Sequence, residues 1–490
     1  MTTRTRSLLL ISPPYHCGVV EVAGRWAPLN LLYIATAARK AGVNVELYDA
    51  MSLFVDQEAI EKKVSEVKPD YVGIGSITAT LPAALETARR IKKVSPWTKI
   101  IFGGVHPTFM AEEVLRADEG AVDFVVCGEG EETTEELLRA LGAGGDPSGV
   151  RGIAFLDSQG EFIKTPPRLF MQDLEAYPAA YDLLDWDTYK YFVVPESRLG
   201  AISTSRGCNH TCTFCSQQLF WNKQWRDRRP EPVVAEIEHL YRKYGVNVIL
   251  ISDEYPTGDA ARWEEILDRL IALDLPLYLL METRAEDIVR DEAILPKYRK
   301  AGIVHIYVGL EATDQETLDL INKELTTDVS KEALRLIRKH GMLSETSFVL
   351  GFPHETEETV AETLRLAKDF DPDMAHFLCI TPWPYAELWD EMKDRVRVHD
   401  YSKYNLIEPI VEPEAMTLRE IDSAIVRCYR DFYMSKMTDF MNYPDEFRRR
   451  YMLSSMKLIM KSSFLVEKIG RLAMPPGMSK MMAAMGKKTG

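Results

Sequence analysis

Short apolar runs alternate with amphipathic stretches through the first 145 residues. Five apolar runs have the length of buried strands, at residues 7–14, 43–50, 70–76, 98–104 and 123–130. Apolar residues recur at helical spacing in the stretches between them, at residues 29–42, 58–69, 81–94 and 109–117. Strands that alternate with helices in this way predict a doubly wound, mainly parallel sheet over residues 1–145.

Residues 146–195 predict a connector. The run GIAFLDSQGEFIKTPP places two short apolar segments on either side of Ser158-Gln159-Gly160, which predicts a β-hairpin. Prolines and aromatic residues follow as far as residue 195.

A second α/β series occupies residues 196–395. Its six apolar runs lie at residues 200–205, 247–252, 277–282, 303–310, 346–351 and 375–380, with helical patterns between them. A spacing of roughly 30 residues is the size of one βα unit, so a partial (βα)6 barrel of the TIM type is expected. The strand pattern stops near residue 396, and residues 396–490 predict a mostly helical C-terminal region.

Composition excludes several classes of protein. The chain has 490 residues, 46% of them hydrophobic, and a net charge of −15. A general nucleic-acid binder would carry a basic face, so no nucleic-acid partner is expected. No stretch reaches the roughly 18 uninterrupted apolar residues of a membrane span. The seven cysteines lack the spacing of a disulfide framework, which favours a reducing, cytoplasmic setting.

The C-terminal tail departs from this acidic balance. From Phe447 to Gly490 there are ten basic residues, one acidic residue and eight of the 20 methionines. One interpretation is a helical tail that packs on an acidic body. The other is a peripheral membrane contact, or a cover for an apolar ligand, because Met adapts its shape and Lys and Arg favour anionic lipid.

Three cysteines lie within eight positions of the loop RGCNHTCTFCSQ, at Cys208, Cys212 and Cys215. Thiolates bind zinc or iron–sulfur clusters. A closed zinc site needs a fourth ligand, and the neighbouring His210 lies too near the cysteines in sequence for a comfortable tetrahedron. Three thiolates on a four-iron cluster instead leave one iron open to a small molecule. The cluster is the preferred interpretation and zinc the alternative.

Small residues follow the strands of the first domain. They occur in Ser12-Pro13-Pro14, in residues 75–78, in Gly103-Gly104 and in residues 128–130. Parallel sheets bind ligands beyond the carboxyl ends of their strands, and small residues let a large ligand approach the backbone. These loops predict a ligand-binding edge, with tight turns alone as the alternative.

The spacing C-x3-C-x2-C, with Phe214 before the last cysteine, resembles the radical S-adenosylmethionine superfamily. The resemblance implies a [4Fe-4S] cluster on the three cysteines, whose open iron binds the amino and carboxylate groups of S-adenosylmethionine. Reductive cleavage then yields a 5′-deoxyadenosyl radical that abstracts hydrogen. Further stretches at the ends of later strands resemble cofactor contacts of that family. The S-adenosylmethionine-binding residues implied in this way are Phe214, Glu254, Arg284, Glu311, Gly351 and Pro353.

The first domain carries SPPY, GGVHPTF and GEGEE and resembles the cobalamin-binding class of these enzymes. The resemblance implies a Rossmann-like cobalamin-binding domain. The implied contacts are Pro14, Tyr15, Ser76, Thr78, Gly103, Gly104, His106, Gly128 and Glu129. The pattern Asp-x-His-x-x-Gly is absent, so cobalamin is expected to bind without an axial histidine from the protein.

Less generic stretches, among them EVAGRWAPLNLLY, SDEYPT, TPWPYAELWDEM and VHDYSKYNLIEP, resemble the family of anaerobic magnesium-protoporphyrin IX monomethyl ester oxidative cyclases. The resemblance implies cyclisation of a magnesium porphyrin ester to the isocyclic-ring product of bacteriochlorophyll biosynthesis. It also implies cobalamin-assisted oxidation, oxygen from water, and an electron donor such as a flavodoxin or ferredoxin. Trp383 and Tyr385 are the substrate candidates, together with Trp221 and Trp225. No catalytic acid or base is assigned.

Two other functions stay open. Most relatives have Pro-Gly-Thr where this chain has Pro384-Tyr385-Ala386, and the chain ends earlier than a cyclase would. A cobalamin-dependent radical methyltransferase acting on another large apolar molecule is therefore one alternative. A cobalamin-linked sensor with a structural cluster is the other.

Overall fold

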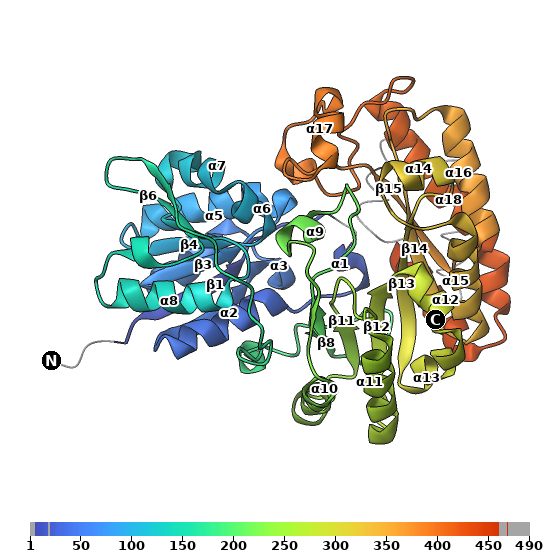
Figure 1. Cartoon of the computed structure of the whole chain (residues 1–490), viewed down its shortest axis with the longest axis horizontal. Coiled ribbons are helices and arrows are strands. Elements are labelled where there is room, and N and C mark those ends of the chain that lie inside the picture. The colour runs from blue at the N-terminus through green and yellow to red at the C-terminus, as the bar shows by residue number, and fades with distance from the viewer. Residues whose placement is uncertain (1–4, 18–19, 460–467, 469–490) are drawn as a thin grey trace.

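The computed structural model describes residues 5–17, 20–459 and 468. Within these residues the N-terminal domain is built on a seven-stranded sheet in the order β2-β1-β3-β4-β5-β6-β7 (Figure 1). The first five strands are parallel and confirm the predicted runs. They are β1 Ser7–Ser12, β2 Asn44–Asp49, β3 Tyr71–Gly75, β4 Lys99–Gly103 and β5 Phe124–Val126.

Helices cover both faces of this sheet. On β1, Leu8 and Leu10 face one core while Leu9 and Ile11 face the other, because successive strand residues point to opposite sides. The first core receives α2 Leu29–Lys40 and α8 Glu131–Gly142. The second receives α4 Gln57–Val67, α5 Leu81–Val94 and α7 Ala111–Arg116. The doubly wound prediction is therefore confirmed.

The predicted hairpin forms from β6 Ile153–Leu156 and β7 Phe162–Lys164. It turns through Gly160, whose φ of +83° suits glycine. β6 also pairs antiparallel with β5, so the hairpin extends the first sheet at its edge.

The second domain contains, in the described part of the chain, a six-stranded parallel sheet in the order β15-β14-β13-β12-β11-β8. The strands are β8 Leu199–Ile202, β11 Val248–Ile251, β12 Tyr278–Thr283, β13 Ile303–Glu311, β14 Leu343–Leu350 and β15 Met374–Cys379. The helices that follow them include α10 Pro230–Tyr244, α11 Ala260–Leu273, α12 Ala285–Arg290, α13 Leu295–Lys300, α15 Thr327–Lys339 and α16 Glu357–Phe370. All six predicted strands are present and β8 and β15 form the two edges, which confirms the partial barrel.

Two helices close the chain as far as it is described, α18 Leu418–Asn442 and α19 Glu446–Ile459. α18 begins with a capping box between Thr417 and Glu420, and it packs on β15 and α16. Most of the predicted basic, Met-rich tail lies outside the described residues. Lys468 is described: it is buried, donates to Ile407 O at 2.9 Å and pairs with Asp422. No described helix is both long and apolar enough to cross a membrane.

Candidate cofactor sites between the two domains

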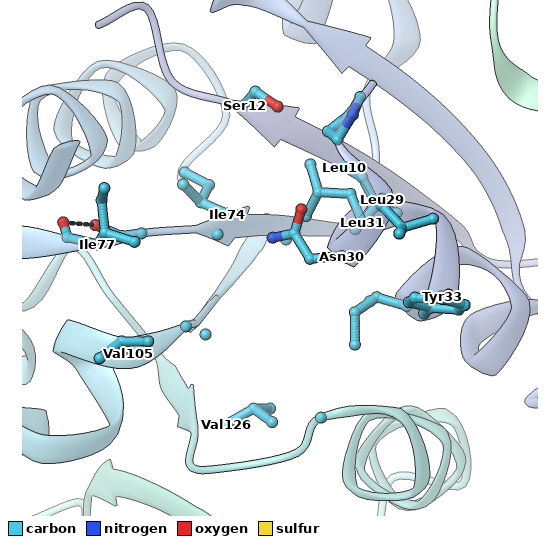
Figure 2. Close-up of a pocket in the computed structure, with 18 of the residues that line it drawn as sticks. Leu10, Ser12, Leu29, Asn30, Leu31, Tyr33, Ile74, Ile77, Val105 and Val126 are labelled. Carbon is cyan, nitrogen blue, oxygen red and sulfur yellow. Dashed lines mark hydrogen bonds between the residues drawn. The ribbon is translucent and has the colours of Figure 1, made fainter. Parts of the chain in front are cut away.

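A cavity of about 590 Å³ lies where the carboxyl edge of the first sheet meets the start of the second domain. From the first domain, the loops after β1, β3, β4 and β5 line it, together with α2. Figure 2 shows Leu10, Asn30, Tyr33 and Ile77 around this space. From the second domain it is lined by Ser203, Ser205, Arg206, Gln217, Phe220, Trp221, Ser252 and Glu254. The predicted ligand-binding edge thus faces the cysteine-containing part of the barrel.

Glycine backbone shapes the rim of the cavity. Gly104 has φ +105°, and a Cβ there would meet Ser76 O at 2.3 Å. Gly128 has φ +77°, and a Cβ built on it meets nothing within 4 Å. The first glycine is required by close backbone approach, while the second leaves free space for a ligand. Such a cradle fits a large flat cofactor that lies close to the backbone.

The structure brings together some of the residues expected to bind cobalamin. Five of them line the cavity: Ser76, Gly103, Gly104, Gly128 and Glu129. Pro14, Tyr15, Thr78 and His106 do not line it. Tyr15 donates to Ser402 O at 2.9 Å, and so it contacts the C-terminal region instead.

His106 is fully buried beside the cavity. Its Nδ1 lies 3.1 Å from Thr78 Oγ1, and its ring meets Tyr385 and Tyr401 edge-on. Its Nε2 has no hydrogen-bond partner among the described residues, and burial lowers the pKa of His106 to about 4. Of the described residues that line the cavity, none is a histidine. The expectation that cobalamin binds without an axial histidine stays a prediction.

The loop with Cys208, Cys212 and Cys215 runs from β9 Ser205–Arg206 to α9 Ser216–Phe220. The structure shows these three cysteines as free thiols. Burial raises the pKa of Cys208, and it raises the pKa of Cys215 to about 11. Buried thiols of this kind become thiolates when a metal displaces their protons.

A zinc site at this loop is not supported. His210, the neighbouring residue that a zinc site would need as its fourth ligand, has its Nδ1 3.3 Å from Glu324 and its ring against Tyr255. Nowhere in residues 5–17, 20–459 and 468 are three His, Cys, Asp or Glu side chains grouped to hold one metal ion. No closed set of zinc ligands is therefore present at this loop among the described residues.

Two buried cations accompany the cysteines. Arg284 is 8% exposed and donates to Glu286 Oε1 at 2.5 Å and to Lys323 O at 2.9 Å. Lys323 is 7% exposed, and its Nζ lies 5.9 Å from the ring centre of Phe214. Among the influences on the pKa of Cys208 is the charge of Arg284, which lowers it. Positive charge beside three thiolates suits an anionic cluster and the carboxylate of a bound amino acid.

The other residues expected to bind S-adenosylmethionine follow successive strands. Glu254 comes after β11, and burial raises its pKa. Glu311 ends β13, where it accepts from Lys323 Nζ and from Ser347 Oγ, both at 3.1 Å. Gly351 follows β14 with φ +90° and donates to Glu355 Oε2 at 2.9 Å. Pro353 accepts from Glu414 N at 2.9 Å. The barrel thus gathers these strand ends on one side, as parallel strands require.

Glu282 was not chosen as a site residue from the sequence. It pairs in register with Tyr307, which in turn pairs with Glu345, so the three side chains share the interior face of inner strands. The exposed surface of Glu282 therefore opens onto the barrel interior. Enclosure by protein, followed by the charges of Glu254 and Asp253, raises the pKa of Glu282 to about 7. The signal that could have found it is an acidic residue at the end of an apolar strand run, in LYLLME.

The four aromatic residues expected to bind substrate lie in different environments. Tyr385 OH lies 2.8 Å from Thr78 Oγ1, and the Tyr385 ring stacks on Phe109 with centroids 4.8 Å apart. Trp383 packs on an apolar cluster around Phe352 and Leu388. Trp221 lines the cavity, whereas the indole of Trp225 donates to Tyr255 O at 2.7 Å.

Family comparisons agree with the two-domain architecture. Residues 15–138 match the B12 binding domain, and residues 202–367 match the radical SAM superfamily. A solved structure of TsrM, a radical S-adenosylmethionine methyltransferase from Kitasatospora setae, with tryptophan and an S-adenosylmethionine analogue bound, superimposes with a TM-score of 0.67. That match is 18% identical and covers 95% of this chain and 98% of TsrM, which shows a shared fold.

Sequence relatives are closer. The anaerobic magnesium-protoporphyrin IX monomethyl ester cyclase of Rubrivivax gelatinosus is 37% identical, over 93% of this chain and 83% of the relative. The cyclase of Cereibacter sphaeroides is 38% identical, over 93% of this chain and 75% of the relative. An uncharacterized methyltransferase of Pyrococcus horikoshii is 31% identical, over 88% of this chain and 93% of the relative. The chain has a B12-binding domain followed by a radical barrel, and it is similar to these cyclases over 93% of its length. It therefore belongs to the cobalamin-dependent radical S-adenosylmethionine family that includes the anaerobic magnesium-protoporphyrin IX monomethyl ester cyclases.

Proposed function

We propose that the chain is an oxidative cyclase that converts magnesium-protoporphyrin IX monomethyl ester into the product with the fifth, isocyclic ring. The observation that carries this proposal is that the cavity of the B12-binding domain lies next to the loop of the three cysteines. Glu254 lines the cavity of the B12-binding domain and accepts from the backbone of Gly207, the residue before Cys208. A substrate between the domains therefore faces both cofactors.

When bound, the cofactors supply a radical that removes hydrogen from the substrate and a further oxidation that lets oxygen enter from water. The chain's own residues hold these groups. Cys208, Cys212 and Cys215 bind the cluster, and the guanidinium of Arg284 donates to the carboxylate of S-adenosylmethionine. Glu311 receives a ribose hydroxyl or an amine, and the cavity edge at Gly104 and Gly128 receives cobalamin. Glu282, with a pKa of about 7, is suited to take a proton at neutral pH.

The substrate is large, flat and apolar, and such molecules bind between aromatic side chains. Rings from three parts of the chain meet beside the cavity. Phe109 stacks on Tyr385 and lies 6.5 Å from Phe220, which meets Trp221 at 4.8 Å. These rings support a porphyrin in preference to a small polar substrate.

Reductive cleavage of S-adenosylmethionine requires one electron, so the proposal includes a donor such as a flavodoxin or ferredoxin. The basic tail after residue 459 is proposed as a peripheral contact with anionic lipid, where a porphyrin would partition. Both statements rest on the proposed reaction and on the sequence.

A methyltransferase is the competing function, because several relatives carry that name. Both enzymes would use the same cofactors, but a methyltransferase would release S-adenosylhomocysteine. The test is anaerobic turnover with the magnesium porphyrin ester, a reductant and S-adenosylmethionine. The cyclase proposal expects the five-ringed product and 5′-deoxyadenosine without S-adenosylhomocysteine. S-Adenosylhomocysteine together with a methylated porphyrin would overturn it.

A further inference from the structure

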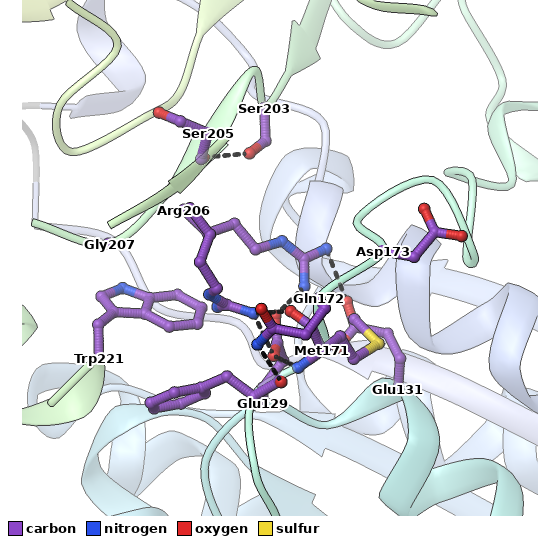
Figure 3. Close-up of polar contacts among 12 residues, drawn as sticks. Glu129, Glu131, Met171, Gln172, Asp173, Ser203, Ser205, Arg206, Gly207 and Trp221 are labelled. Carbon is purple, nitrogen blue, oxygen red and sulfur yellow. Dashed lines mark hydrogen bonds and ion pairs between the residues drawn. The ribbon is translucent and has the colours of Figure 1, made fainter. Parts of the chain in front are cut away.

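Four charged side chains join the two domains. Three of them, Glu129, Glu131 and Arg206, line the cavity (Figure 3). Arg206 Nη1 lies 2.6 Å from Glu129 Oε1, and Arg206 Nη2 lies 2.8 Å from Glu131 Oε1. Arg226 Nη1 lies 2.9 Å from Glu129 Oε2. The side chains of the two glutamates and two arginines are between 5% and 10% exposed. Glu129 and Glu131 belong to the first domain, and both arginines belong to the second.

The carboxylate of Glu129 is saturated by these contacts. Oε1 accepts from Arg206, and it also lies 3.2 Å from Arg226 Nη2. Oε2 accepts from Arg226 and from the backbone N–H of Met171 at 2.9 Å. A carboxylate with both oxygens engaged has little capacity left to hold a ligand. Glu129 therefore lines the cavity without being directed at its contents.

The same contacts lead to the cysteine loop along a short, stiff path. Arg206 ends β9, which pairs with β10 Arg226–Asp227. Gly207 follows with φ +88°, and a Cβ there would meet Gln224 O at 2.1 Å. The Gly207 N–H donates to Glu254 Oε2 at 3.3 Å, while the Trp221 indole donates to Glu254 Oε1 at 3.1 Å. Cys208 is the next residue. A displacement of Arg206 would therefore also move Cys208, the first cluster ligand.

We propose that Glu129 is a positioning residue that acts through Arg206 on the cysteine loop, and not a direct cobalamin contact. By holding β9 against the rim of the cavity, it sets how the cluster lies relative to the cobalamin-binding edge. This inference rests on the cofactors of the proposed function and is independent of the substrate's identity. A buried ion pair suits this role because its geometry is specific even where its net stabilisation is small.

The test compares wild-type protein with E129Q, R206K and E132Q. E129Q removes one of the two carboxylate charges that hold Arg206, and Glu131 keeps the other. R206K keeps the positive charge but loses the two-pronged contact with Glu129 and Glu131. Glu132 is the matched control, because it lies in the first turn of α8, three residues after Glu129. Its side chain is 42% exposed, and its partner is Arg168 at 3.7 Å. Each full-length protein is reconstituted with iron and sulfide, and electron paramagnetic resonance of the reduced cluster is recorded without cobalamin. Hydroxocobalamin binding is then titrated by absorbance, and thermal unfolding is measured in parallel.

The inference expects shifted cluster g-values in E129Q and R206K and an unchanged spectrum in E132Q. It also expects cobalamin affinity within about threefold of wild type in all variants. A wild-type spectrum in E129Q with a tenfold or greater loss of cobalamin affinity would show direct contact and overturn the inference (~1.4 kcal/mol). An equal spectral shift in E132Q would also overturn it, since any lost charge would then suffice. If E129Q fails to fold, the spectrum of R206K is the test: shifted g-values support the inference, and a wild-type spectrum overturns it. Wild-type protein without a cluster signal would overturn the proposed function and this inference together.

Discussion

The hydroxyl groups of Tyr385 and Thr78 lie 2.8 Å apart, although 307 positions separate them in the chain. Thr78 belongs to the edge of the B12-binding domain, and Tyr385 belongs to the loop after the last barrel strand. This contact joins the second domain to the first through residues other than those of the charged network around Glu129.

Replacing Tyr385 by Phe removes the hydroxyl and leaves the ring on Phe109. We expect a loss of about 1 kcal/mol of stability, because a largely buried hydrogen bond is worth that amount. The measurement is a double-mutant cycle with Thr78→Val, in which thermal unfolding gives the stability of the wild type, both single variants and the double variant. A coupling energy near zero would mean that the two hydroxyls act independently.

Replacing Cys215 by Ala should remove the cluster. Iron content after anaerobic reconstitution should fall to background, and 5′-deoxyadenosine production should fall with it, because the two remaining thiolates hold a cluster poorly. Cobalamin binding should persist, since Cys215 is not among the residues that line the cavity. Cys428→Ala is the control, because that buried cysteine lies on α18. Normal iron content in the Cys215 variant would contradict the cluster assignment.

Gly104→Ala should weaken cobalamin binding and lower the unfolding temperature. Its φ of +105° is strained for alanine, and the new methyl would meet Ser76 O at 2.3 Å. Strain of this kind costs roughly 1–3 kcal/mol. Gly142→Ala is the matched control, since a Cβ there meets nothing within 4 Å. Equal behaviour of the two variants would remove the case for a glycine cradle at residue 104.

His106 should make the protein sensitive to acid below pH 6.5. Burial lowers the pKa of His106 to about 4, whereas an unfolded histidine titrates near about 6.5. Between these values the unfolded chain binds a proton that the folded chain does not. The free energy of unfolding therefore falls as pH drops from 6.5 to 4, by about 3 kcal/mol from this residue. Unfolding temperatures of wild type and His106→Gln across this range measure the difference, and parallel pH curves would refute the prediction.

Glu282→Gln should alter the pH dependence of turnover. If the Glu282 carboxylate accepts a proton, wild-type activity should rise through a pKa of about 7 as the group ionises. The variant should lose that rise while iron and cobalamin contents stay normal. Glu264→Gln, on the outer helix α11, is the control. A variant that retains the wild-type pH profile would exclude Glu282 as the proton acceptor.

Local sequence patterns were enough to predict most of the strands and helices. The continuous apolar run of β1 identified a strand that is buried on both faces, because Leu8 and Leu9 must point to opposite faces of any sheet. Gly-rich strand ends marked the cofactor edge, since parallel strands bring their carboxyl ends together. Cys208, Cys212 and Cys215 were identifiable because ligand type and spacing are local properties of one loop.

Contacts between distant segments were beyond local patterns. Glu129 was expected to bind cobalamin, and it lines the predicted cavity, yet its oxygens are taken by Arg206 and Arg226 from the other domain. His106 was expected at the same edge, but it is enclosed by Tyr385 and Tyr401 from the C-terminal part of the chain. The sequence by itself determined the strand order along the chain, the cysteine loop and the glycine edge, because each depends on neighbours within a few residues. Only the tertiary structure decided which charged and aromatic side chains meet across the domain boundary, because that depends on how two independently patterned domains pack together.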